Sequence, residues 1–511
     1  MKITLITKIT LIMKRIFFLA LWVAFLGGAN VYAGCEIRGS FAAKDALSEL
    51  LKGQMDCPKN VIEFRDLLLS QGLSLRPSMV ANRGFHNTSL GSFSFFETVE
   101  GDSRSPRIRI AEGEFFFGHF TEERAGLIEL QQTPDAGALM IELIAWDESK
   151  GAFNFYELIG DGVAGKWFYR GDSFDIFADN QKLHLQKDPA KPEFGSRLRC
   201  SACHVNGGPI MKELAAPHND WWTEGRALPF SPHTESARVA ALTRTLLPAE
   251  IFAKKVLGGL NRLNGDVRFQ NYLKSLSLRE RLRPLFCPME VNFASDLRPL
   301  SSPSKEIQIP SEFLVDSRLA TGSGTVTRLS YLKALEAVNS RFLQDGGEGA
   351  RDADHAWLTP VKADSDKLLV KDLVAQGVID SEFVFDVLSV DFINPVTSEG
   401  RCSLLKWVPS RFSKDWKREF QANLSAVPGA SAEELLKNMT LKERNQSAHQ
   451  SKAQSYLQAS FANLAADGMD AKWMNLLNRR RQEIRDSEIS KNPRGQILEP
   501  GFRVIFPVFS P

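Results

Sequence analysis

Two cysteines and a histidine lie within five residues of one another near the middle of the chain. Cys200 and Cys203 are separated by two residues in the stretch RLRCSACHVNGGP, and His204 follows the second cysteine directly. In an α-helix, side chains three and four positions apart project from one face, so a single turn would bring both thiols and the imidazole together. The NGGP that follows is typical of the end of a short helix. The spacing therefore predicts a compact site on one helical turn.

The pattern C-x-x-C-H is typical of the covalent attachment of haem c, and residues 200–204 match it at every fixed position. Two thioethers at this spacing can reach the vinyl groups on one edge of a porphyrin, and the adjacent imidazole can bind the iron from below the ring. In this stretch, and in a short flank, the chain resembles the c-type cytochromes. The resemblance implies one covalent haem c on Cys200 and Cys203, with His204 as the proximal iron ligand.

The elements expected before the motif are strands, whereas a small all-helical cytochrome c would have helices on both sides. This order is similar to that of the β-sheet haem c proteins of the cytochrome c′-β type. Three other uses of the motif stay open. They are a structural zinc site, which would need a fourth ligand, a thiol–disulfide active site, which would need a thioredoxin-like βαβ setting, and a plain disulfide between Cys200 and Cys203. Haem attachment is the favoured interpretation.

The second axial ligand would decide what such a haem does, because a closed iron suits electron transfer and an open iron admits small ligands. Met211 lies shortly after His204 and is one candidate for the distal ligand. His218 lies further along the chain and is a candidate either for the distal ligand or for a distal acid/base. An open position is the third alternative. Weaker candidates are Met289, His86, His119, His184, His233 and His355.

The N-terminus has the features of an export signal. Lys14 and Arg15 precede an apolar run from Ile16 to Leu26, and the small residues around Ala33 fit a cleavage site. The run is too short for a permanent membrane span, and no later stretch is apolar enough for one. We therefore expect a mature chain in the periplasm or another extracytoplasmic compartment, with Met1 or Met13 as the true start. Haem c is also attached outside the cytoplasm, so the two predictions agree.

The cysteines outside the motif are expected to form disulfides, because an exported chain meets an oxidising environment. Cys35, Cys57, Cys287 and Cys402 allow three pairings. Cys35–Cys57 with Cys287–Cys402 is favoured, because each of these pairs closes one plausible sub-domain.

The remaining pattern predicts an α+β protein, with an antiparallel β-rich N-terminal domain leading into a haem c segment and then a mainly helical C-terminal region. Short apolar runs such as Leu139 to Trp146 and Phe153 to Ile159 are separated by turn-like residues. Ser173 to Phe177 is expected to continue this series of strands. The predicted segments are 1–33 (signal peptide), 34–83 (helical, with the first disulfide), 84–190 (β-rich), 191–231 (haem c attachment) and 232–511 (mainly helical, with the second disulfide).

Helical spacing of apolar residues begins near residue 232. Pro248 is expected to open a helix whose buried face includes Ile251 and Phe252. Ser431 and Glu434 form a capping-box pattern at the start of a later helix. Residues 298–330 are expected to be loop.

Charge and composition exclude some function classes. The chain has 511 residues and a formal net charge of +2, so no basic excess favours nucleic-acid binding. The sequence has no Ser-His-Asp pattern and no nucleotide-binding loop. The favoured function is an exported mono-haem c-type cytochrome that transfers electrons to or from a redox partner protein. The alternatives are a haem c enzyme, peroxidase- or oxygenase-like, with an open distal site and His218 as acid/base, and a structural or sensory haem protein.

Overall fold

The computed structural model describes residues 34–39, 43–82, 93–101, 108–178, 200, 204–210, 219–221, 235–287, 291–294, 306–327, 359–441 and 445–464. The expected signal peptide at residues 1–33 lies outside the described residues.

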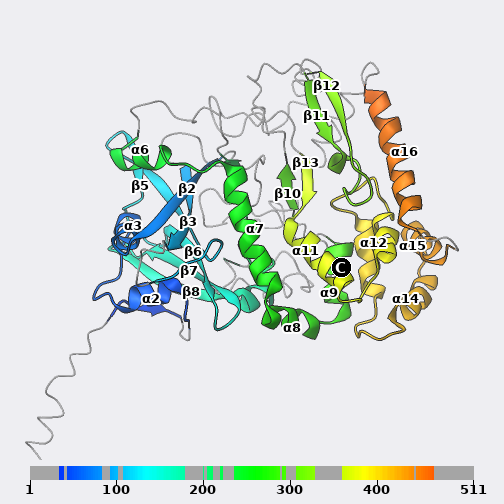
Figure 1. Ribbon diagram of the computed structural model, residues 1–511, viewed down its shortest axis with the longest axis horizontal. Helices are drawn as coiled ribbons and strands as arrows, with labels where there is room; N and C mark the ends of the chain where they lie inside the picture. Colours follow the sequence, from blue (N-terminus) through cyan, green and yellow to red (C-terminus); the bar gives the residue numbers. More distant parts are fainter. Residues whose placement is uncertain are drawn as a thin grey trace, which may run out of the picture.

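A nine-stranded sheet forms the N-terminal half of the molecule (Figure 1). The strand order is β1-β8-β7-β6-β4-β3-β2-β9, with β5 paired to β4, and every pairing except the parallel β1–β8 is antiparallel. The sheet takes in segments on both sides of the 84–190 region. The strands are β1 (Ile37–Arg38), β2 (Leu73–Asn82), β3 (Phe93–Gly101), β4 (Phe115–Arg124), β5 (Leu127–Leu130), β6 (Leu139–Asp147), β7 (Ala152–Gly160), β8 (Gly165–Asp172) and β9 (Asn219–Trp221).

Helices cover both faces of this sheet, which explains why β6 and β7 read as continuous apolar runs instead of alternating. On one face lie α2 (Ala46–Lys52), α3 (Val61–Ser70) and α6 (Ala237–Thr243). The apolar side chains between these helices and the sheet, here called the outer core, include Leu50, Phe64, Phe95, Phe117, Trp167 and Val239.

The opposite face packs against α7 (Ala249–Gly265) and α8 (Val267–Ser275), and α7 runs between the sheet and the C-terminal helices (Figure 1). We call the apolar side chains on this face the junction core. Its members include Val80, Phe116, Ile144, Trp146, Phe153, Phe155, Phe177, Phe252, Val256, Leu263, Phe269 and Leu369. Because Leu369 belongs to a C-terminal helix, the junction core joins the two halves of the molecule.

The C-terminal half is mainly helical and has its own apolar core. Its helices are α9 (Leu278–Phe286), η1 (Ser311–Phe313), α11 (Asp364–Ala375), α12 (Ser381–Leu388), α13 (Glu399–Ser403), η4 (Leu404–Trp407), α14 (Trp416–Ser425), α15 (Ala430–Thr440) and α16 (Gln446–Leu464). Two small antiparallel pairs accompany them: β10 (Val291–Ala294) with β13 (Thr359–Lys362), and β11 (Glu306–Pro310) with β12 (Ser323–Thr327).

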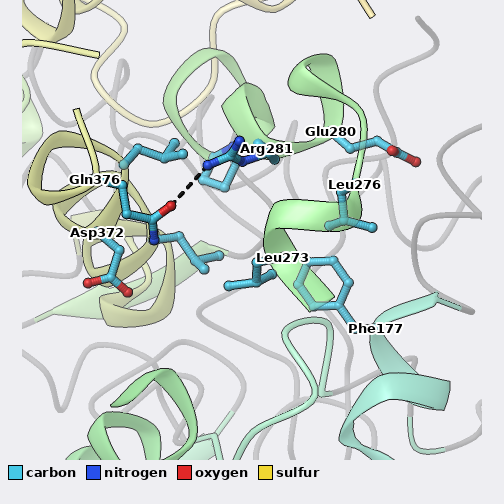
Figure 2. A pocket seen from close by; sticks show the side chains of 10 residues that line it. Phe177, Leu273, Leu276, Glu280, Arg281, Asp372 and Gln376 are labelled. Carbon is cyan, nitrogen blue, oxygen red and sulfur yellow. Dashed lines mark hydrogen bonds between the residues drawn. The ribbon is translucent and has the colours of Figure 1, made fainter. Parts of the chain in front are cut away.

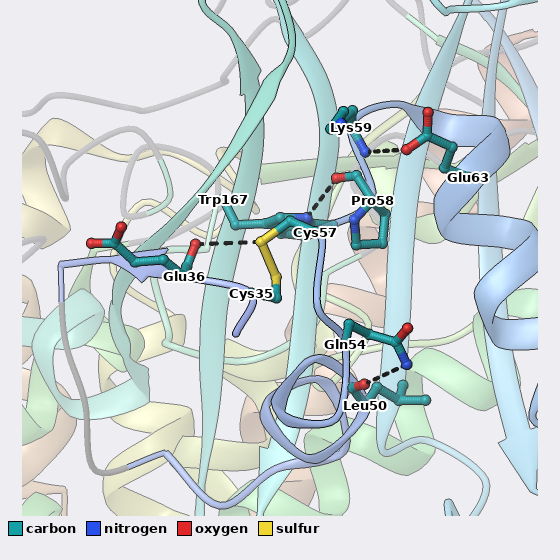
Figure 3. The surroundings of a disulfide bond; sticks show 9 residues. All are labelled: Cys35, Glu36, Leu50, Gln54, Cys57, Pro58, Lys59, Glu63 and Trp167. Atoms are coloured by element: carbon teal, nitrogen blue, oxygen red, sulfur yellow. Dashed lines mark hydrogen bonds between the residues drawn. A yellow bond between two sulfur atoms is a disulfide. The ribbon is translucent and has the colours of Figure 1, made fainter. Parts of the chain in front are cut away.

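Both predicted disulfides are confirmed. Cys35 pairs with Cys57 and Cys287 pairs with Cys402, with Cα–Cα distances of 4.5 and 4.7 Å. The first disulfide joins the residues just before β1 to the segment before α3. Figure 3 shows it beside Trp167 of β8. The indole Nε1 of Trp167 donates a hydrogen bond to the carbonyl of Pro58 at 3.1 Å, so this corner is fixed both covalently and by a buried hydrogen bond (Figure 3).

The α+β class is confirmed, but three local predictions are wrong. Residues 173–178 are helical instead of a strand, because the carboxylate of Asp172 caps them by accepting hydrogen bonds from the backbone N–H groups of Phe174 and Asp175. Residues 298–330 contain the β11–β12 hairpin. Helix α15 begins after Gly429 without a side-chain cap, so the Ser431–Glu434 pattern is not its capping box.

Helix α7 does begin directly after Pro248, but Ile251 is 39 % exposed and does not belong to its buried face. A capping box occurs instead at α9, between Ser277 and Glu280. None of the described helices combines the length and the apolar character that a bilayer crossing requires.

Candidate functional site

Cys200 and His204 lie on one helical turn, as the spacing predicts. The backbone N–H of His204 donates to the carbonyl of Cys200 at 2.8 Å, which is the hydrogen bond that closes one α-helical turn. The turn ends at once, because Gly207 N–H bonds back to His204 O at 2.9 Å and Gly207 has a φ of 70°. Cys203 lies outside the described residues.

The His204 ring is oriented by the backbone of its own segment. Its Nδ1 lies 2.8 Å from the carbonyl oxygen of Gly208. A carbonyl oxygen can only accept, so Nδ1 carries the proton and donates it, and in the neutral ring the lone pair is on Nε2. The ring of Phe155 packs edge-on against the imidazole, with centroids 5.1 Å apart. Nδ1 bonded to a backbone carbonyl is the arrangement that orients a metal-binding histidine for ligation through Nε2.

The segment from His204 to Ile210 is wedged between the two halves of the molecule. A side chain at Gly207 would place its Cβ 2.4 Å from the carbonyl oxygen of Ser173, in the sheet half. On the other side Pro209 packs so closely on α7 that a Cβ on Gly259 would lie 2.7 Å from the Pro209 ring. Asn206 donates a hydrogen bond to Ser365 of α11. Contacts from three separate elements therefore fix the position of the turn.

Cys200 is half-buried and packs on the junction core. This core is rich in aromatic side chains, which suits the apolar faces of a porphyrin. The residues of the motif that the structure describes therefore fit a haem c group in three respects: the helical turn, the tautomer of the imidazole and the apolar surroundings.

One shallow pocket borders the junction core (Figure 2). It encloses about 350 Å³ of space that is partly open to solvent, and Phe177, Leu273 and Leu369 line it together with polar residues of α9 and α11. At its edge the Arg281 side chain donates to the Gln376 amide oxygen at 2.9 Å (Figure 2). Because Phe177 and Leu369 belong to both, this pocket lies next to the junction core on which Cys200 packs.

His119, a weaker candidate for the distal ligand, is on the wrong face of the sheet. Its ring stacks between Phe95 and Phe117, with centroid distances of 5.6 and 5.5 Å, and both phenylalanines belong to the outer core. Phe155, which contacts His204, belongs to the junction core on the other face. The sheet itself separates the two histidines, so His119 cannot share an iron with His204. The other distal candidates, Met211, His218, Met289, His86, His184, His233 and His355, lie outside the described residues.

The structure also assembles a Ser-His-Asp arrangement that the sequence does not reveal. Ser389 Oγ lies 2.9 Å from His449 Nδ1, and His449 Nε2 lies 3.1 Å from a carboxylate oxygen of Asp386. All three side chains are buried, and Asp386 is 0 % exposed. A buried serine cannot meet a substrate, so these bonds hold α16 against α12 and do not form a hydrolytic site.

No family model, no curated protein and no solved structure matches this chain.

Proposed function

We propose that this protein is an exported mono-haem c-type cytochrome, with haem bound through Cys200 and Cys203 and with the iron ligated by His204. The observation that carries the proposal is the geometry of the turn. The Cys200–His204 backbone hydrogen bond puts both residues on one helical turn, and the bond from Nδ1 to the Gly208 carbonyl leaves Nε2 as the nitrogen that would bind iron. Attachment would add each thiol S–H across one vinyl C=C bond, so nothing leaves and no oxidant is consumed.

The chain's own residues would keep this ligand still during turnover. The Gly208 carbonyl accepts a hydrogen bond from Nδ1–H, Phe155 limits rotation of the ring, and the Asn206–Ser365 bond ties the turn to α11. When bound, the haem supplies a one-electron redox couple. A ligand that does not move between oxidation states lowers the reorganisation that accompanies electron transfer, which supports electron exchange with a redox partner protein. The two disulfides fit an oxidising, extracytoplasmic compartment.

Covalent attachment can be tested directly. The protein is expressed with its leader in a host that matures c-type cytochromes, denatured, and assayed for haem that stays with the chain. We expect one haem per chain, and we expect Cys203→Ala to lose most of it. Ser201→Ala is the matched control, because it changes the same turn and keeps both thiols. Haem loading of Cys203→Ala equal to that of Ser201→Ala would refute the attachment.

A haem c enzyme is the second candidate, with His218 as distal acid/base. The pocket of Figure 2 favours it, because it leaves a space beside the junction core that is open to solvent and could admit a molecule little larger than water. Carbon monoxide added to the reduced protein distinguishes the two candidates. An unchanged low-spin spectrum supports electron transfer, and Met211→Ala or His218→Ala should then open the site, depending on which residue is the ligand. Immediate binding of carbon monoxide supports the enzyme.

A further inference from the structure

A group of three cations, two of them buried and the third, Arg318, half-buried, lies in the C-terminal half, apart from the residues discussed so far. Arg318 lies shortly after η1, Lys362 ends β13, and Arg401 lies in α13. Arg401 is 0 % exposed and Lys362 is 5 % exposed. Two buried carboxylates, Asp316 and Asp366, act on these cations through their charges. Withdrawing cations from water in one region costs free energy unless each charge is compensated.

Asp316 compensates one of the three cations fully. Arg318 donates to both oxygens of Asp316, from Nε at 2.8 Å and from Nη2 at 2.6 Å. Lys362 Nζ lies 3.6 Å from the same carboxylate, which is an ion pair but beyond a good hydrogen bond. Both side-chain hydrogen bonds that the Asp316 carboxylate accepts from these cations therefore come from Arg318, and Lys362 is left with charge attraction alone.

Arg401 has no carboxylate as a direct hydrogen-bond partner among the described residues. Its guanidinium donates to two backbone carbonyls, those of Val390 at 3.3 Å and Asn394 at 3.0 Å. The nearby carboxylate of Asp391 already accepts hydrogen bonds from Asn394 and Ser398. Asp391 therefore acts on Arg401 only through its charge.

Each of the three cations has one buried donor atom that lacks an acceptor. Within the part of the chain that the structure describes, Lys362 Nζ, Arg318 Nη1 and Arg401 Nε are buried without a hydrogen-bond partner. Burial, together with the charges of Arg318 and Arg401, lowers the pKa of Lys362 to about 7. Buried unsatisfied donors are rare in folded proteins, and donors that are all cationic call for an anionic acceptor.

We propose that Arg318, Lys362 and Arg401 form a buried binding site for a carboxylate group. A carboxylate offers two oxygens with several acceptor positions, so one group could take hydrogen bonds from more than one of these donors. It would also add the negative charge that the neighbouring aspartates do not supply. The carboxylate could come from a free organic acid or from a propionate of the haem.

The haem source has structural support, although it rests on the function proposed above. Asn206, two residues after His204, donates to Ser365, and the next residue, Asp366, acts electrostatically on both Arg318 and Lys362. The Asn206–Ser365 hydrogen bond and the charge of Asp366 therefore connect the motif with the cations.

The first arm of the test uses succinate as the probe and thermal unfolding of the full chain as the readout, with sodium chloride at equal ionic strength as reference. We expect succinate to raise the Tm of the wild type, because a ligand bound only to the folded state stabilises it. Lys362→Met should lose this rise. Lys367→Met should keep it, because Lys367 is an exposed lysine of α11 that pairs with Asp364. If Lys362→Met does not fold, the wild-type titration still decides the matter.

The second arm separates the two sources of the carboxylate. A rise in Tm with the haem-loaded protein identifies a free acid as the ligand. A rise only in the haem-free Cys200→Ala/Cys203→Ala chain identifies a propionate. Lys362→Met should then shift the midpoint potential of the haem to more negative values, because loss of a nearby positive charge destabilises the reduced haem relative to the oxidised haem. The absence of any succinate effect in both forms, with an unchanged potential, would overturn the proposal. If the chain carries no covalent haem, the proposed function fails while the succinate titration still tests the site.

Discussion

Two histidines on opposite faces of one sheet are held in opposite tautomers. His204, on the junction side, donates a hydrogen bond from Nδ1–H to the backbone carbonyl of Gly208. His119, on the outer side, uses Nε2, which lies 2.6 Å from a carboxylate oxygen of Glu97. Its Nδ1 is buried without a hydrogen-bond partner among the described residues. The lone pair of His119 therefore faces packed apolar side chains, whereas that of His204 is on the nitrogen suited to bind iron.

The charged groups that surround His119 explain its role. Burial alone would raise the pKa of Glu97, but the hydrogen bond from His119 and the charge of Arg65 outweigh it and lower the pKa. Burial is also the largest effect on His119 and lowers its pKa, so the ring is neutral and donates to an ionised Glu97. Arg65 completes the group by donating to Glu97 at 2.7 Å. A histidine locked in a charge-neutral buried network serves stability, whereas Nδ1 bonded to a backbone carbonyl is the orientation that ligation through Nε2 would require.

The largest effect is expected from Glu97→Gln, which breaks the network on the outer face. The change removes the charge that compensates Arg65, and breaking a buried ion pair costs about 3–5 kcal/mol in the free energy of unfolding. Glu100→Gln on the same strand is the control, because Glu100 is 30 % exposed and its pair with Lys255 contributes at most about 1 kcal/mol. Urea unfolding measures both variants. Equal losses in the two variants would show that the network does not differ from a surface pair.

A smaller effect is expected from Gly207→Ala, which strains the turn that holds His204. A φ of 70° costs a non-glycine residue about 1–3 kcal/mol. The new Cβ would also meet the Ser173 carbonyl. We expect a lower Tm and less covalent haem. Gly258→Ala in α7 meets no atom within 4 Å, so it should leave haem content unchanged and stabilise the helix by up to about 1 kcal/mol. Full haem loading of Gly207→Ala would show that the position of the turn is not critical.

The smallest effect concerns pH. Because the pKa of His119 is lower in the folded than in the unfolded chain, the unfolded chain binds more protons as pH falls below about 6.5. The contribution of His119 is therefore complete above that pH and is lost as pH falls toward the folded pKa. His119→Gln, which can still donate to Glu97, should flatten the stability curve between about pH 6.5 and 5. A curve with the wild-type slope would assign this pH dependence to other groups.

Local chemistry explains what could be predicted from the sequence. The spacing of Cys200 and His204 predicts a single turn, and the structure has it, because a helical hydrogen bond depends only on neighbours along the chain. Strands such as Leu139 to Trp146 were also recognisable, because apolar runs between turn residues favour β-structure. The prediction of a strand from Ser173 to Phe177 was wrong because the cap by Asp172 outweighed the apolar pattern.

The sequence by itself determined the local turn at Cys200 and the α+β class, and it favoured the two disulfide pairs that form, because each pair closes one plausible sub-domain. Only the tertiary structure decided on which face of the sheet each histidine lies, since helices bury both faces and the alternation that would reveal the facing is lost. It also decided that Ser389 meets His449, and that Arg318, Lys362 and Arg401 lie in one buried region. Residues far apart in sequence come together through the packing of whole elements, which no local pattern records.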